Sequence, residues 1–321
     1  MKKAGLSVAA LVALGLGSAS AADLGKVYTK APPPAPAVAV WDVAFGAAVM
    51  NNYVFRGVSQ SNRNGSVAAY FEPRYNITPD LQLYAGVAGE SISFTNRAAA
   101  EIDVYGGIRP TFGPLALDVG VWGYFYPGGQ CIDLNPPAGI CPAGSAFLPN
   151  GNAMKKDVSF YEVYGKATYT FNDVFALGGA VFYSPNFLNF GTDGTYAAVN
   201  GKITAPSTLF GTSGIGAYLS GEFGRQWLGT TDAFYGNIRL ADYNTWNVGV
   251  GFTYKVFTLD LRYSDTNLNR GDCNALTSDF TASAVSPAWM TAANPSGLGS
   301  KWCGASFIAK LSADVTLNQL K

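Results

Sequence analysis

From Trp41 onward, apolar and polar residues alternate with a period of two along most of the chain. In residues 257–264, for example, the two alternating sets are Phe257, Leu259, Leu261 and Tyr263 against Thr258, Asp260, Arg262 and Ser264. A helix would distribute such charges around its circumference, whereas a strand collects them on one face. We therefore predict twelve strands, of which 234–241 has a weak pattern: residues 42–55, 66–77, 81–91, 101–109, 115–126, 158–171, 174–184, 214–224, 234–241, 246–254, 257–264 and 307–317.

The links between these segments alternate in length. Tight turns are expected at residues 78–80, 112–114, 172–173, 225–233 and 255–256, and longer loops at 57–65, 92–100, 127–157, 185–213 and 265–302. Short turns on one side and long loops on the other are typical of up-and-down transmembrane barrels. The alternation also requires an even strand count, so that both chain ends lie on the same side. The predicted fold is an all-β, antiparallel up-and-down transmembrane β-barrel of about twelve strands.

Composition separates this barrel from a soluble β-sandwich, which would also alternate. A sandwich turns charged residues outward, but here only 13% of residues are charged while 14% are aromatic. Several predicted strands end in aromatic residues that suit the lipid headgroup level, namely Trp41, Tyr75, Tyr169, Tyr183, Trp246 and Tyr254. Apart from the N-terminus, no apolar stretch approaches the about 20 residues of a spanning helix. The barrel is therefore favoured.

The N-terminus predicts export. Lys2 and Lys3 precede an apolar run over residues 6–16, and Ala19-Ser20-Ala21 offers the small-residue site of a signal peptidase. A membrane anchor is the alternative, but it needs about 20 apolar residues. We expect a cleaved signal peptide over 1–21, a proline-rich periplasmic tether over 22–40 and the barrel over 41–321, located in the outer membrane of a Gram-negative bacterium.

The residue inventory argues against several functions. The chain has no histidine, which removes Ser-His and Cys-His nucleophile systems, so we do not expect an enzyme. Glu101 and Asp103 share one face and could in principle hydrolyse a glycosidic bond, but charge on the lumen wall is the favoured interpretation. The formal net charge of zero, about −2 without Lys2 and Lys3, offers no basic patch for nucleic acid. No phosphate-binding or dinucleotide motif is present, so no cofactor is expected.

Four cysteines, Cys131, Cys141, Cys273 and Cys303, suit disulfides in an oxidising envelope. Without histidine and without a CxxC motif, a metal site at these cysteines is disfavoured. Three pairings are open in principle. We favour Cys131–Cys141 and Cys273–Cys303, because each pair would close one long loop.

The polar phase of the strands predicts a charged lumen. Ten acids are expected to face inward, namely Asp42, Glu72, Glu90, Glu101, Asp103, Asp118, Glu162, Glu222, Asp260 and Asp314. Six bases share that phase, namely Arg74, Arg109, Lys166, Arg239, Arg262 and Lys310. These charges could pair and fill the barrel, or they could line a water channel. Inward glycines favour the channel, and the excess of four acids predicts a mild preference for cations.

Arg56, expected at the outer end of the first strand, is the strongest single functional candidate. Its guanidinium could attract anions at the mouth of the pore, or it could tie the first loop to the barrel wall.

Several segments resemble a known family. They are the sequence Asn52-Tyr53-Val54-Phe55-Arg56-Gly57-Val58-Ser59-Gln60-Ser61 and residues 83–87, 101–107 and 258–265. They resemble the TorF family of proteobacterial porins, over about residues 43–264. The resemblance implies an outer-membrane barrel with porin function. The two cysteine-bearing loops depart from the family pattern, and the end at Asn318-Gln319-Leu320-Lys321 departs from the aromatic last residue of most outer-membrane barrels.

Two functions therefore compete. The first is passive diffusion of small hydrophilic solutes or ions through a porin-like channel. The second is a structural or adhesin barrel that displays its loops and has a filled lumen. The expected partners are outer-membrane lipid, the solutes or ions, the barrel assembly machinery and, if the barrel oligomerises, further copies of the chain.

Overall fold

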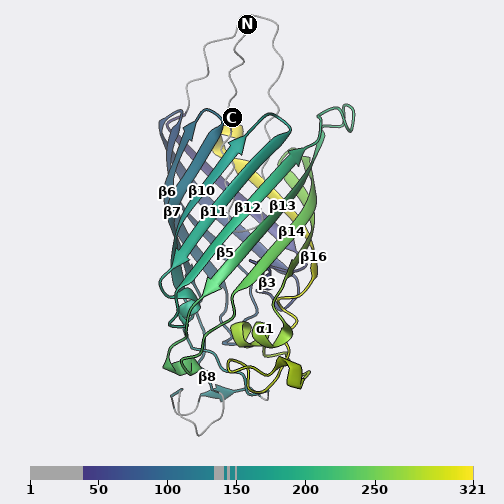
Figure 1. The fold of residues 1–321 in the computed structure, drawn as a ribbon. Coiled ribbons are helices and arrows are strands. Elements are labelled where there is room, and N and C mark those ends of the chain that lie inside the picture. Colours follow the sequence, from purple (N-terminus) through teal and green to yellow (C-terminus); the bar gives the residue numbers. More distant parts are fainter. Residues whose placement is uncertain (1–38, 134–140, 143–144, 149, 321) are drawn as a thin grey trace, which may run out of the picture.

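The computed structural model describes residues 39–133, 141–142, 145–148 and 150–320. Twelve of its strands form one closed antiparallel barrel, in the order β1-β16-β15-β14-β13-β12-β11-β10-β7-β6-β5-β4, with β4 pairing back onto β1 (Figure 1). The barrel strands are β1 (Trp41–Met50), β4 (Ser66–Thr78), β5 (Leu81–Glu90), β6 (Glu101–Phe112), β7 (Leu115–Phe125), β10 (Phe160–Thr170), β11 (Phe175–Ser184), β12 (Gly194–Thr204), β13 (Ile215–Leu228), β14 (Tyr243–Tyr254), β15 (Phe257–Thr266) and β16 (Ser306–Thr316).

The expected fold class is confirmed, but one predicted strand is wrong. Residues 194–204 form β12, although they were expected to lie in a long loop. Their inward face carries Tyr196 and Ala198, so the contrast between the two faces is weak. Residues 234–241 form no strand. Asp232 caps the short helix η2 (Ala233–Tyr235) there, and the backbone then turns through left-handed residues. The turn expected at 225–233 is accordingly at 205–214.

The outer face of the barrel is apolar. Val119 and Val121 on β7 are about half exposed, as are outward residues of the other strands such as Val104, Val181, Phe223, Val248 and Leu311. Exposed aromatic residues lie toward both ends, with Trp41 and Tyr75 in contact at one end. Because closure pairs every strand on both sides, the backbone polar groups are satisfied without water. This surface is that of a membrane-spanning barrel.

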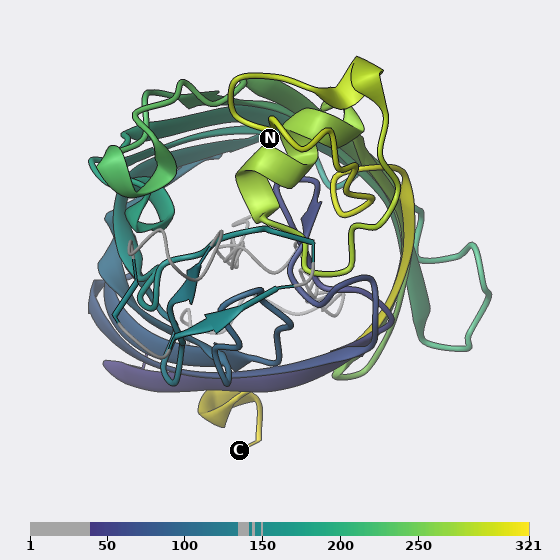
Figure 2. The same cartoon turned by 90° about the horizontal axis from the view of Figure 1, so that it is seen from below.

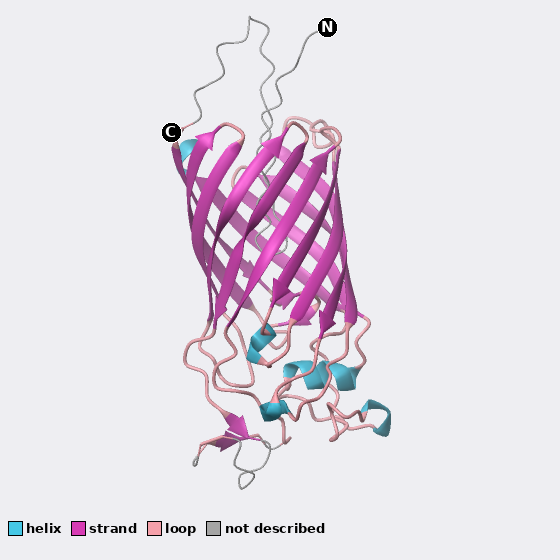
Figure 3. Ribbon diagram, turned by 60° about the vertical axis from the view of Figure 1, so that its left-hand side comes forward, coloured by secondary structure: helices cyan, strands magenta, loops and turns pink. Residues whose placement is uncertain are grey.

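The two ends of the barrel differ. Both the first and the last barrel strand have their terminal ends at the side of the short turns, which we call the turn end (Figure 1). The long links gather at the opposite side, the loop end, with helix α1 (Arg270–Thr277) and the short helices η1 (Phe187–Asn189), η2 and η3 (Pro287–Trp289) (Figure 3). A last short helix, η4 (Leu317–Gln319), follows β16. No helix in the described part of the chain is long and apolar enough to cross a membrane.

The loops pack against one another. Two disulfides, Cys131–Cys141 and Cys273–Cys303, join the pairs favoured from the sequence. The short strands β8 (Ile132–Asp133) and β9 (Ala146–Phe147) pair within the loop that contains the first disulfide. Buried apolar residues from several loops, among them Phe94, Tyr126, Leu276 and Trp302, form one cluster. The loop end is therefore a compact cap. The signal peptide expected over 1–21 and residues 22–38 of the tether lie outside the described residues.

The outward apolar face yields a stability prediction. Val119→Arg should lower the free energy of unfolding in lipid vesicles by about 2–4 kcal/mol, because the charge would face hydrocarbon near the middle of β7. Thr168→Arg is the matched control. Because Thr168 lines the interior cavity, this substitution should lower the free energy of unfolding by less. Urea titration of both variants measures the difference. Equal losses would contradict the inside–outside assignment.

Candidate functional site in the barrel lumen

The first loop, residues 51–65, turns back into the barrel (Figure 2). The predicted first strand thus ends at Met50 rather than at residue 55. The loop contains a hairpin of two short strands, β2 (Val54–Phe55) and β3 (Val58–Ser59). Arg56 and Gly57 connect them, both with positive φ, at 47° and 79°. Two such residues in a row form the two-residue turn that suits a hairpin, and glycine is favoured at its second position.

The hairpin turn fits closely against the wall. A Cβ on Gly57 would lie 2.5 Å from Thr245 Oγ1 and 2.3 Å from Thr266 Cγ2. The base of the loop is also held, since Asn52 Nδ2 donates to Ser306 Oγ (2.8 Å) and the Ser59 amide donates to the carbonyl of Trp302 (2.8 Å). These contacts fix the position of Arg56 at the tip of the hairpin.

Arg56 lies inside the lumen and binds the wall. Its Nη1 donates to Glu162 Oε1 (2.8 Å) and its Nη2 to Glu162 Oε2 (2.7 Å), which is a bidentate ion pair. Nη1 also donates to Gln226 Oε1 (3.1 Å). The side chain of Arg56 is 5% exposed and that of Glu162 0%. Because Glu162 is on β10 and Gln226 on β13, this contact ties the first loop to two separate parts of the wall.

Aromatic rings surround the guanidinium. The Arg56 Cζ lies 4.5 Å from the ring centroid of Phe55, 4.4 Å from that of Tyr196 and 4.9 Å from that of Phe182. Tyr124 donates its hydroxyl to Glu162 Oε2 (3.1 Å). The charge is thus removed from water and compensated by one carboxylate and by ring faces.

A cavity of about 420 Å³ extends from Arg56 to the exposed turn at residues 172–174. Its charged lining consists of six bases, Arg56, Arg109, Lys166, Lys202, Arg262 and Lys310, and four acids, Asp118, Asp173, Glu222 and Asp260. Six minus four leaves an excess of two positive charges. The predicted excess of acids therefore does not apply to this cavity. Glu90, Glu101, Asp103 and Glu162 are buried elsewhere in the described interior, toward the loop end.

Other predicted lumen residues form two ionic groups on the wall. In the first, Glu72 accepts from Arg74 Nε (2.6 Å) and Arg109 Nη1 (2.9 Å), and Arg109 lies 3.5 Å from Asp118. In the second, Asp260 accepts from Arg262 Nε (3.0 Å), and Lys310 on β16 is opposite Asp260 in the strand register. Some charges on the wall therefore form ion pairs, and some line a cavity. The sequence had left open whether the charges fill the barrel as pairs or line a channel, and the structure shows both arrangements.

One residue predicted to face the lumen lies outside it, and some residues that contact the site were not predicted to do so. Arg239 was expected inside, but its side chain is 67% exposed in a loop, near Asp242. Lys202 was missed because its strand, β12, was missed. Its position two residues after Asn200 and four after Ala198 would have placed it on the same face as those residues. Gln226 was missed because an uncharged residue near a strand end carries no distinctive pattern.

The fold and the first loop inside the lumen define the class: a transmembrane β-barrel with an inward-folded loop. A family model described as "Bacterial protein of unknown function (Gcw_chp)" matches residues 35–293, and the chain belongs to this family. No curated protein matches it.

Solved structures of outer-membrane barrels are similar to the chain at low identity. An outer membrane channel from Pseudomonas putida F1 has 12% identity and a TM-score of 0.45, over 89% of this chain and 100% of that one. A Pseudomonas aeruginosa FadL homologue has 12% identity and a TM-score of 0.38, over 86% and 89%. A loop-deletion mutant of OmpT, an outer membrane protein of Vibrio cholerae, has 11% identity and a TM-score of 0.36, over 86% and 100%.

The buried pair makes a double-mutant prediction. Arg56→Ala and Glu162→Ala should each lower the free energy of unfolding by about 3–5 kcal/mol, because each leaves an uncompensated buried charge. The double variant should lose less than the sum of the two. Arg239→Ala, at an exposed arginine, should change stability by less than about 0.5 kcal/mol. Additive losses in urea titrations would show that the two side chains act independently.

Proposed function

We propose that this protein is an outer-membrane channel through which small hydrophilic solutes or ions diffuse passively, with the first loop limiting the passage. The observation that carries the proposal is the cavity of about 420 Å³ inside a closed barrel, which ten charged side chains help to line and which Arg56 bounds. In this proposal the turn end faces the periplasm and the loop end the outside, as in other barrels with short turns and long loops. The resemblance to TorF porins agrees with it.

The proposed channel prefers anions. The sequence predicted a mild preference for cations, but that count treated all inward charges alike. Apart from Arg56, whose charge Glu162 neutralises, the lining of the cavity carries five bases and four acids, whereas much of the acid lies beyond the constriction. A ring of fixed charge in a narrow pore attracts the ion of opposite sign. Lys166 on β10 and Lys202 on β12 are among the bases that line the cavity.

The second candidate is a barrel that mainly displays its loops. The compact apolar cap and its two disulfides favour it. Swelling of liposomes in small sugars separates the two functions. Swelling supports diffusion, and its absence in vesicles that contain folded barrel supports display. We propose no enzymatic role, because the chain has no histidine. Insertion by the barrel assembly machinery and association of copies in the membrane belong to the same proposal.

Ion selectivity tests the channel directly. In planar bilayers under a salt gradient, the wild-type protein should show a reversal potential of anion-selective sign. Lys202→Glu changes the lining by two charges and, with Arg56 neutralised by Glu162, leaves four bases and five acids, so the potential should move to the cation-selective sign. Lys255→Glu, at an exposed turn, is the control and should leave it unchanged. A cation-selective wild-type channel would contradict the proposed preference.

A further inference from the structure

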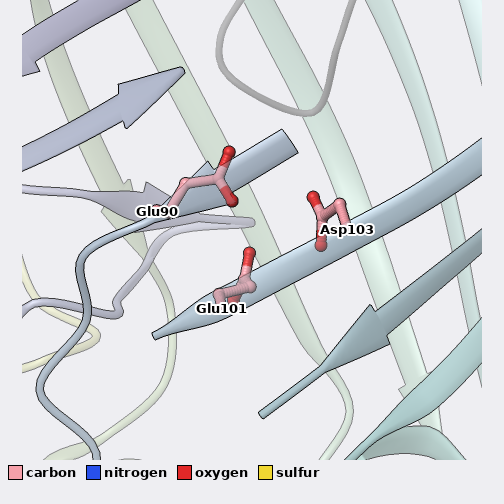
Figure 4. A group of neighbouring side chains, drawn as sticks. All are labelled: Glu90, Glu101 and Asp103. Atoms are coloured by element: carbon pink, nitrogen blue, oxygen red, sulfur yellow. The ribbon is translucent and has the colours of Figure 1, made fainter. Parts of the chain in front are cut away.

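Three carboxylates gather near the loop end of the lumen. Glu90 is the last residue of β5, Glu101 is the first of β6, and the two are directly opposite in the register. Asp103 lies two residues further along β6, on the same face. One oxygen from each side chain can be chosen so that all three lie within 4.8 Å of one another. Figure 4 shows the three side chains converging.

The cluster is buried and only partly hydrogen-bonded. Glu90 and Glu101 are 2% exposed and Asp103 is 4% exposed. Glu101 accepts hydrogen bonds from the hydroxyls of Tyr53 (2.6 Å) and Tyr126 (2.9 Å). Among the described residues, by contrast, nothing donates to either carboxylate oxygen of Glu90 or to Asp103 Oδ1.

No base in the described part of the chain forms an ion pair with these three side chains; the nearby Arg56 is paired with Glu162 instead. Like charges this close repel strongly in a region that excludes water, and buried charges are stable only when they are paired or bind a metal. The cluster therefore needs a positive partner that no described residue supplies as an ion pair, either protons or a cation.

We propose that Glu90, Glu101 and Asp103 bind one calcium ion. The donors are all oxygen, which hard cations prefer. Two oxygens on one calcium ion at about 2.3–2.6 Å lie at most about 4.6–5.2 Å apart, which accommodates the 4.8 Å limit of the cluster. Magnesium gives up its water reluctantly and usually keeps several water ligands, so a buried cluster of protein oxygens suits calcium better. Unpartnered oxygens of Glu90 and Asp103 supply the free ligands.

The site would also order the loops. Tyr53 belongs to the first loop and lies three residues from Arg56, and Tyr126 begins the loop after β7. Both hydroxyls donate to Glu101. A cation that keeps Glu101 ionised strengthens these two hydrogen bonds, because a charged acceptor binds a hydroxyl more strongly than a neutral one. Calcium binding is thus coupled to the packing of the cap, and it does not depend on whether the barrel conducts.

Calorimetric titration of the full-length folded protein, after treatment with a chelator, tests the site with calcium chloride as the probe. We expect one calcium ion per chain. Glu90→Gln and Asp103→Asn should weaken binding by more than about tenfold, because even outer-shell partners of a metal change its affinity by that much. Glu222→Gln is the matched control, since Glu222 is an inward glutamate bonded to Tyr196 outside the cluster, and it should bind calcium like the wild type.

Thermal unfolding provides a second readout that does not require the variants to bind. Calcium should raise the unfolding temperature of the wild type and not that of Glu90→Gln. In chelator, Glu90→Gln should be at least as stable as the wild type, because it removes an uncompensated buried acid. Absence of calcium binding to the wild type, equal binding by the Glu90→Gln variant, or magnesium binding as tight as calcium binding would each overturn the assignment.

Discussion

The closed sheet decides which side chains of this protein face lipid and which face the lumen. A chain in hydrocarbon must satisfy every backbone donor and acceptor within itself, and β1 achieves this by pairing with β16 on one side and β4 on the other. Because side chains alternate between the two faces of a strand, closure places one set of them outside the barrel and the other set inside. The outer face takes Val119, Val121 and their counterparts, and the inner face takes buried charged residues of the strands such as Glu72, Arg109 and Asp260. The lumen is therefore where chemistry and packing compete for space.

Arg56 shows how that competition is resolved. A guanidinium carried inside on a loop is costly unless it is paired, and here Glu162, Gln226 and aromatic rings take the place of water. The same pair neutralises an acid that would otherwise line the pore. The cavity between Arg56 and the turn end is lined by more bases than acids. The position of one arginine thus bounds the cavity and neutralises one of the inward acids.

The barrel could be predicted from the sequence because lipid imposes one strict pattern on every strand. Eleven of the twelve predicted strands overlap barrel strands, and the exception is instructive. In β12, Tyr196 and Ala198 face inward, so the polar phase is blurred, and the loop at 234–241 alternates without being a strand. The predicted number of strands equals the observed number because the missed strand β12 was offset by the false strand at 234–241. Alternation of apolar and polar residues indicates which face of a strand each side chain occupies. Where the alternation is weak, it cannot show whether a strand is present.

The site was less predictable than the barrel, since it depends on depth and on contacts between distant segments. The sequence predicted that Glu162 and Asp118 face inward. It did not predict that the first loop enters the lumen, so that Asp118 lines the cavity while Glu162 is buried outside it. Glu101 and Asp103 stood out as a pair. Their third member, Glu90, joins them only through the register of β5 with β6. Arg56 was recognisable as important, yet its partner is 106 residues away in the chain.

In the proposed channel, Arg56 on the first loop limits passage through the lumen. Single-channel recording of Arg56→Ala beside Arg56→Lys and the wild type in planar bilayers tests it most directly, with folding of each barrel verified by its heat-modifiable mobility on gels. Conductance should be highest for Arg56→Ala, because the side chain that spans from the first loop to Glu162 is removed, and intermediate for Arg56→Lys, which keeps a charge but not the bidentate contact. Equal conductance in all three folded proteins would contradict the account.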